Sequence, residues 1–286
     1  MSAPPVVALP AADPRPGWRR DARALGIVLH RELFRFLSDR VRAMTSLAQP
    51  LAFLFLLGTG LSGLAADAGG MDMRTYMFPG VIALCCLFTA LFSAVTIVWD
   101  REFGFLREML VAPVSRGVVV VGKCLGGTVV ATLQGCVILS LAGLAGVPYT
   151  PRLLLTLLGA TLLLSFTLTA FGLAVAVRMA VTQPFMALMQ MFTMPMFFLS
   201  GAVFPLADQP AWIRALSTVN PLTYAVDPMR RAVFEHLSVP AATAERYGQG
   251  VTWGGWEVPE WLCLAIVTAT GAALLGSAVG PLRRGD

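Results

Sequence analysis

Six long apolar stretches constrain the fold of this chain more than any other feature of its sequence. A helix needs roughly 20 apolar residues to cross the hydrocarbon core of a bilayer, because every backbone N–H and C=O must be satisfied within the segment. The stretches are 47–64, 78–99, 118–144, 153–177, 185–204 and 259–282. The pattern therefore predicts six transmembrane helices.

Composition supports the membrane assignment. Hydrophobic residues make up 57% of the chain and charged residues 13%, and the mean hydropathy is +0.74, outside the range of soluble globular proteins. The alternating pattern of a transmembrane β-barrel is absent from the sequence, which favours helices. We expect an all-α polytopic membrane protein.

Arginine and lysine in the short connections predict the orientation of the chain. They gather in residues 15–42 and 101–123, at Arg178 and at the tail pair Arg283 and Arg284. Both termini should then lie in the cytosol of a bacterial inner membrane protein, with 205–258 outside. Residues 1–21 hold no apolar run of signal-peptide length, so we expect them to remain as a disordered tail.

Residues 22–42 alternate in the way of an amphipathic helix. Its apolar face carries Leu25, Leu29, Leu33, Phe36 and Leu37, and its polar face carries Arg31, Glu32, Arg35 and Asp39. The pattern predicts a helix lying in the inner membrane interface. The alternative is a polar stub that leads into the first span.

A charged insert separates the second and third apolar stretches. At helical spacing its apolar residues form one arc and its charged residues another. The first arc includes Phe103, Leu106 and Leu110, and the second Arg101, Arg107 and Glu108. Pro113 would end this helix, predicted over 100–113. Glu102 projects from the apolar arc, and two interpretations stay open: it pairs with a cation or donor, or it caps the start of the helix.

Residues 117–124 follow the phosphate-loop pattern except at the last position, where Cys124 replaces the required Ser or Thr. Because the run enters an apolar span, we do not interpret it as an ATP site. Lys123 is expected to extend its ammonium to the inner interface. We expect no cofactor, metal or catalytic residue on this chain.

The outer segment 205–258 contains two short amphipathic pieces separated by Asn220 and Pro221, too short to span. We expect a re-entrant helical hairpin over the first part and a loop over the rest. Trp212 and Tyr224 are candidates for a gate or a ligand contact, and interfacial anchoring is the alternative.

With these features the chain resembles the type-2 ABC transporter permeases, which include drug-resistance permeases of the daunorubicin type and nodulation lipo-oligosaccharide exporters. The resemblance rests on Gln49–Pro50, on the insert 100–116, and on residues 220–224 with Arg230 and Arg231. It implies that 43–286 form the transmembrane domain and that the insert is a coupling helix.

The resemblance also implies partners and site residues. Two separate ABC ATPase subunits, holding ATP and Mg, would dock on the coupling helices of two identical permease copies, with membrane lipids around them and no nucleic acid. The docking residues would be Arg101, Glu102, Phe103, Leu106, Arg107, Glu108 and Leu110. The outer contacts would come from Trp212, Asn220, Pro221 and Tyr224.

The implied function is export of an amphipathic drug, natural product or lipid-like molecule by a permease that is not itself an enzyme. Alternatives are export of a glycolipid or polysaccharide, a membrane-embedded lipid-modifying enzyme, and a secondary carrier. A membrane-embedded enzyme would need a nucleophile, a base or a metal cluster near one leaflet, and the sequence offers no such group. Dependence on ATP would separate the carrier from the exporter.

Overall fold

The computed structural model describes residues 18–60, 72–104, 116–206, 209–237, 247–248 and 250–284, and these are almost entirely helical. The elements are α1 (Trp18–Ser38), α2 (Arg40–Ala52), the π-helix η1 (Phe53–Leu57), α4 (Met73–Glu102), α6 (Arg116–Ser140), the 3₁₀ helix η2 (Ala142–Ala145), α7 (Pro151–Ala176), α8 (Thr182–Leu199), α9 (Ala211–Val219), α10 (Pro221–Glu235), β1 (Thr252–Trp253), β2 (Trp256–Glu257) and α12 (Glu260–Arg284).

The predicted all-α membrane fold is confirmed. In the described ranges five helical segments are long and apolar enough to cross a membrane: Ala43–Gly60, Met73–Glu102, Gly117–Ser140, Pro151–Ala176 and Glu260–Gly280. The predicted span 185–204 falls on α8, which has 18 residues and carries Gln183 and Gln190. The count of six spans therefore stays a prediction.

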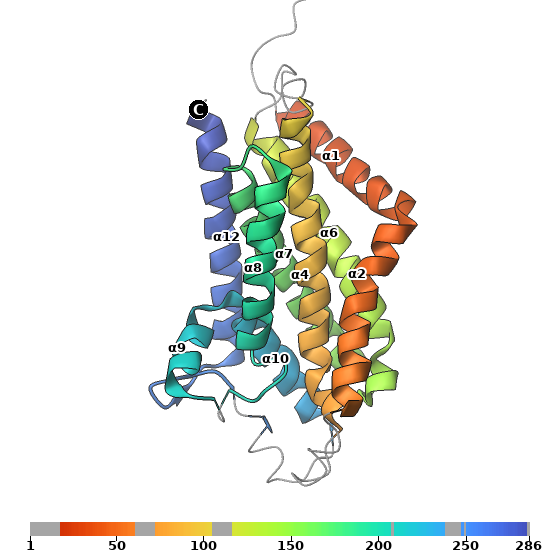
Figure 1. The fold of residues 1–286 in the computed structure, drawn as a ribbon, viewed down its shortest axis with the longest axis vertical. Helices are drawn as coiled ribbons and strands as arrows, with labels where there is room; N and C mark the ends of the chain where they lie inside the picture. The colour runs from red at the N-terminus through yellow and green to blue at the C-terminus, as the bar shows by residue number, and fades with distance from the viewer. Residues whose placement is uncertain are drawn as a thin grey trace, which may run out of the picture.

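The long helices run side by side in one bundle with two distinct ends (Figure 1). The C-terminal end of α4 and the N-terminal end of α6, which the charged insert connects, lie at the end of the bundle that also holds the start of α1 and the C-terminal end of α12; we call it the insert end. The opposite end, with α9 and α10, we call the hairpin end. This arrangement agrees with the predicted placement of the two termini on one side.

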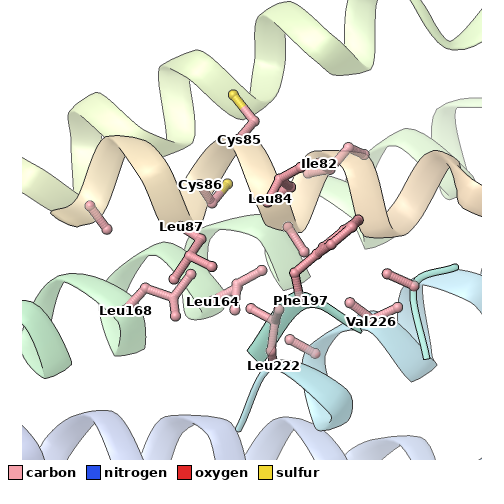
Figure 2. Close-up of a cluster of buried hydrophobic side chains, with 14 of the residues drawn as sticks. Ile82, Leu84, Cys85, Cys86, Leu87, Leu164, Leu168, Phe197, Leu222 and Val226 are labelled. Carbon is pink, nitrogen blue, oxygen red and sulfur yellow. The ribbon is translucent and has the colours of Figure 1, made fainter. Parts of the chain in front are cut away.

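Helix α4 is the centre of the bundle, in contact with α2, α6, α7, α8 and α10. Its apolar side chains are buried nearly along its whole length, which a helix that is apolar all round requires. Figure 2 shows side chains of α4 meeting Leu164 and Leu168 of α7, Phe197 of α8, and Leu222 and Val226 of α10. The core is thus continuous from the middle of the bundle to the hairpin end.

The entry segment differs from the single helix predicted over 22–42. Helix α1 ends at Ser38 and α2 begins at Arg40, so that α1 slants away from the bundle while α2 runs along it (Figure 1). Further on, Pro50 lies inside α2 and the helix widens to the π-helix η1. Because proline lacks an N–H, it interrupts the regular hydrogen-bond ladder, and a π-turn absorbs such a defect.

The outer segment contains the two short helices that the sequence predicts, α9 and α10, with Asn220 between them. Part of the segment predicted as loop is a small antiparallel hairpin in which Trp253 pairs with Trp256. Gly254 and Gly255 both have positive φ, 58° and 91°, which a two-residue turn of this kind demands.

Candidate functional site

A buried cluster of charges connects three helices near the insert end. The Lys123 ammonium of α6 lies 2.7 Å from the Asp100 carboxylate of α4 and 3.5 Å from the Glu32 carboxylate of α1. It also donates to the Thr96 hydroxyl at 3.1 Å. Arg31, which is partly exposed, lies 3.5 Å from both carboxylates. We call Glu32, Asp100 and Lys123 the buried ion cluster.

The cluster corrects two expectations. Lys123 does not extend to an interface, because its side chain is 2% exposed and is surrounded by its partners. Glu32 does not lie on the polar face of α1 with Arg31, Arg35 and Asp39, which are exposed; it is turned towards α6 and 5% exposed. A buried charge needs a partner of opposite sign, and here each charge meets that need with the others.

Glycines on α6 allow the close approach that buries Glu32. A Cβ at Gly126 would lie 2.9 Å from the Cβ of Glu32, and one at Gly122 would lie 3.1 Å from Val28. The small-xxx-small spacing of Gly122 and Gly126 thus marks a real helix contact. The similar pair on α12 is Gly276 and Gly280. A Cβ at either glycine would meet no atom of the described residues within 4 Å.

The charged insert begins differently from the predicted helix over 100–113. Residues 100–102 form the last turn of α4, and the chain then turns at Gly104, whose φ is +80°. Phe103 is 71% exposed at this point. The remaining predicted docking residues, Leu106, Arg107, Glu108 and Leu110, lie outside the described residues, so their role stays a prediction.

Arg101 and Glu102, which follow Asp100 in the insert, bind to the α7–α8 connection (residues 177–181) and to the start of α8. Arg101 donates to the Met179 carbonyl at 3.1 Å. Glu102 accepts from the Thr182 N–H at 3.1 Å and from its hydroxyl at 2.5 Å. Of the two interpretations of Glu102, the structure shows a carboxylate with a donor in this chain, and the helix that it caps is α8.

A cavity of about 280 Å³ lies between α2, α4 and α8. Its apolar wall is made of Phe88, Leu91, Phe92, Met186 and Met189, and its polar groups are those of Thr45, Ser46, Gln49, Gln190 and Thr193. Among these lining residues none is charged. The Thr193 hydroxyl donates to the Met189 carbonyl, whereas the Gln49 and Gln190 side chains are exposed. The cavity can therefore hold a mainly apolar molecule and offer amides to its polar part.

A larger groove of about 870 Å³ lies between α1, α6 and α12 near the insert end. Its walls are mainly apolar and include Gly117, Gly276 and Gly280, and Asp21 is also among the lining residues. It offers fewer groups that could orient a ligand than the smaller cavity does. We therefore take the cavity between α2, α4 and α8 as the candidate transport site.

Three of the four predicted outer contacts serve the fold of the hairpin end. The Asn220 side chain caps α10 by accepting from the Leu222 N–H, and it donates to the Met196 carbonyl at 2.7 Å. Pro221 occupies the first turn of α10. The Tyr224 hydroxyl donates to the Thr218 carbonyl and accepts from the Trp253 indole. Of the four, Trp212 exposes its side chain, at 66%.

Arg230, one of the residues that carried the resemblance, fastens the hairpin end. Its guanidinium lies 4.4 Å from the centre of the Tyr76 ring and donates to the Gly201 carbonyl, to which the Tyr76 hydroxyl also donates at 3.0 Å. Gly201 has a φ of +75°, a conformation that favours glycine. The contact joins α4, the end of α8 and α10.

At the same end, Asp72 caps α4. Partial burial would raise the pKa of Asp72, but hydrogen bonds from the Arg74 guanidinium and N–H, together with its charge, outweigh burial and lower the pKa. This carboxylate thus stays ionised at neutral pH, with its charge next to the first turn of the central helix.

Sequence reasoning missed the pairing of Asp100 with Lys123 and the role of Thr182. Lys123 is the sole lysine of a chain whose basic residues are otherwise arginine, and Asp100 directly follows an apolar span. Those two facts could have marked both as candidates for a buried pair. No spacing pattern marks Thr182, because its partner Glu102 lies 80 residues away.

Comparison with known proteins adds the family. The profile of the ABC-2 type transporter family matches residues 23–234. A putative transport permease, ycf38, of Cyanophora paradoxa is 27% identical over 216 residues, which cover 74% of each chain. Nodulation protein J of Rhizobium leguminosarum bv. viciae is 28% identical over 65% of this chain and 72% of its own length.

A further relative is a probable multidrug ABC transporter permease, YbhR, of Escherichia coli K12. It is 24% identical over 205 residues, or 71% of this chain. The match spans 52% of YbhR, so this chain corresponds to about half the length of that protein.

Proposed function

We propose, because this chain belongs to the ABC-2 type transporter family, that it forms the membrane subunit of an ATP-driven exporter. Its role as a transport permease follows from the family and from relatives that are named transport permeases. In the proposal, separate ABC ATPase subunits bind ATP and Mg and dock at the insert end. Exposed Phe103, at the start of the insert, supplies an apolar contact for that docking.

The observation that carries the export proposal is the cavity between α2, α4 and α8. Its walls combine aromatic and thioether side chains with hydroxyls and amides, and no charged side chain is among the described residues that line it. Such a lining favours molecules that are largely apolar with a few hydrogen-bonding groups over ions. An amphipathic drug, natural product or lipid-like molecule fits this chemistry.

Two copies of the chain pair in this proposal, with the cavity facing the shared path. Support comes from the exposed amides of Gln49 and Gln190 on the faces of α2 and α8 that border the cavity. Glutamine side chains facing lipid are costly, so a polar path or a second copy should cover them. An identical second copy is the simplest partner.

The proposed orientation places the insert end in the cytosol of a bacterial inner membrane. The basic residues near that end support it, since cytosolic connections carry an excess of Arg and Lys. Exposed apolar side chains on α1, among them Ile27, Phe34 and Leu37, then enter the inner leaflet beside the bundle. At the hairpin end, exposed Trp212 and Trp261 anchor the outer interface.

The relatives divide between two substrate classes. One is named a probable multidrug permease and another a nodulation protein. We favour the amphipathic small molecule, because the cavity of about 280 Å³ can enclose only a small group or the end of a larger one. A glycolipid or polysaccharide, moved with its sugar chain outside the cavity, is the alternative.

The test is to purify the chain from its native membrane in mild detergent and to identify associated subunits. We expect an ABC ATPase in a one-to-one ratio, and ATP-dependent uptake of amphipathic fluorescent compounds into inside-out vesicles. Gln190→Leu should change which compounds are moved without releasing the ATPase. Uptake that persists without ATP, or a chain that purifies alone under conditions that preserve known ABC complexes, would contradict the proposal.

A further inference from the structure

We propose that Arg101 and Glu102 are positioning residues which join the charged insert to α8, rather than contacts of the ATPase. The inference rests on the proposed function and specifies a route by which movement at the insert end reaches the cavity. Movement of the insert would reach the candidate transport site through the hydrogen bonds from Arg101 to Met179 and from Thr182 to Glu102.

The geometry at the start of α8 supports this role. Thr182 is the first residue of α8, and the residue before it, Val181, has no side chain that could cap the helix. The first N–H groups of a helix lack partners within the helix and form its positive end. The Glu102 carboxylate satisfies the Thr182 N–H and places a negative charge at that end. An acidic cap is here supplied by a different helix.

Arg101 and Glu102 use complementary chemistry on neighbouring groups. The arginine donates to a carbonyl of the α7–α8 connection, and the glutamate accepts from an N–H and a hydroxyl three residues further on. The pair therefore fixes the connection in one register against the end of α4. The side chain of Phe103, the next residue, is exposed, which leaves it available to a partner.

Helix α8 leads from this contact to the cavity. Thr182 is the first residue of the helix, and Met186, Met189, Gln190 and Thr193 line the cavity further along it. The rise of an α-helix places Gln190 about 12 Å from Thr182. Because hydrogen-bonded helices move largely as rigid units, a displacement of the insert is expected to shift these four side chains together.

Positioning of α8 and docking of the ATPase predict different results when Thr182, the partner of Glu102, is substituted. Thr182→Val removes the hydroxyl that donates to Glu102 and leaves the insert unchanged. If Glu102 acts through α8, Thr182→Val should lower export per ATP hydrolysed by about fivefold, the factor that corresponds to about 1 kcal/mol for one hydrogen bond, and Glu102→Ala, which removes the acceptor of two, should lower it at least as much. The double variant should be no worse than Glu102→Ala, because the two act on one contact.

The full-length permease is purified with its ATPase, and the amount of bound ATPase, ATP hydrolysis, export and the thermal midpoint are measured. We expect Glu102→Ala and Thr182→Val to retain the ATPase and to lower the midpoint only slightly, and Glu102→Gln, which keeps an acceptor, to retain most of the export. The matched control Phe103→Ala should instead reduce the bound ATPase.

Loss of the ATPase in Glu102→Ala together with normal export by Thr182→Val would overturn the inference and return Glu102 to the docking surface. Additive effects in the double variant would also overturn it. Absence of an ATPase from the unaltered protein would be a failure of the proposed function itself, and it is visible before any variant is made.

Discussion

At the scale of single residues, Lys123 is a buried charge that depends on its ionic partners. Its side chain is 2% exposed, and its ammonium contacts two carboxylates from two other helices. Removal of one member of such a cluster leaves the others buried without compensation, which costs about 3–5 kcal/mol. We therefore expect Lys123→Met to lower the thermal midpoint and the yield of the purified protein strongly.

A compensated variant serves as the control for this prediction. Lys123→Met combined with Glu32→Gln and Asp100→Asn removes the charges together and should recover most of the midpoint. Arg152→Met, which changes an exposed arginine on α7, should have little effect. If Lys123→Met alone were as stable as Arg152→Met, the cluster would not contribute to stability.

The same residues show what sequence could not predict at this scale. The amphipathic pattern of 22–42 assigns Glu32 to a polar face, because a helical wheel treats every charge as solvent-seeking. In the structure Glu32 is turned towards α6, where the ammonium of Lys123 meets its carboxylate, while Arg31, Arg35 and Asp39 are exposed. Burial of a charge depends on a partner from elsewhere in the chain, and periodicity within one segment does not contain that information.

At the scale of elements, the contact of α1 with α6 depends on glycine. We expect Gly126→Ala to push α1 away, because its Cβ would lie 2.9 Å from the Glu32 Cβ and 3.0 Å from its Cγ. The strain should cost about 1–3 kcal/mol, measured as a lower thermal midpoint in detergent.

The α12 pair provides a matched control, since the two glycines have the same spacing. A Cβ at Gly276 would meet no atom within 4 Å, so Gly276→Ala should be neutral or slightly stabilising through helix propensity. Equal losses in both variants would show that the cost comes from the loss of glycine itself and not from the α1–α6 contact.

Element positions were largely predictable, and their ends were not. Apolar length alone placed the helices that became α4, α6, α7 and α12. Apolar periodicity does not mark where a helix ends, so it did not predict the end of α4 at Glu102 or the break between Ser38 and Arg40. It also contains no signal for the π-helix η1.

At the scale of the whole molecule, the exposed face of α8 should contact a second copy of the chain. Met191 is 61% exposed on this helix. We expect Met191→Cys, in a protein with Cys136 replaced by Ser, to form a disulfide-linked dimer in oxidised membranes. The other four cysteines are buried and should not interfere. The product is measured by its doubled mass on a non-reducing gel.

Leu37→Cys on α1, also exposed, is the control and should remain monomeric. A dimer from Leu37→Cys but not from Met191→Cys would place the second copy on another face of the bundle. The sequence predicts a pair only through family resemblance, because a single chain does not distinguish an apolar face that meets lipid from one that meets another protein.

The shortness of α8 has a consequence for the bilayer around it. Its 18 residues, at a rise of about 1.5 Å each, extend about 27 Å, whereas the hydrocarbon core is about 30 Å thick. If α8 spans the bilayer, as the sequence predicts for 185–204, the acyl chains beside it should compress by about 3 Å. The helix that lines the cavity would then border a locally thinned membrane, where an amphipathic molecule has a shorter distance to cross.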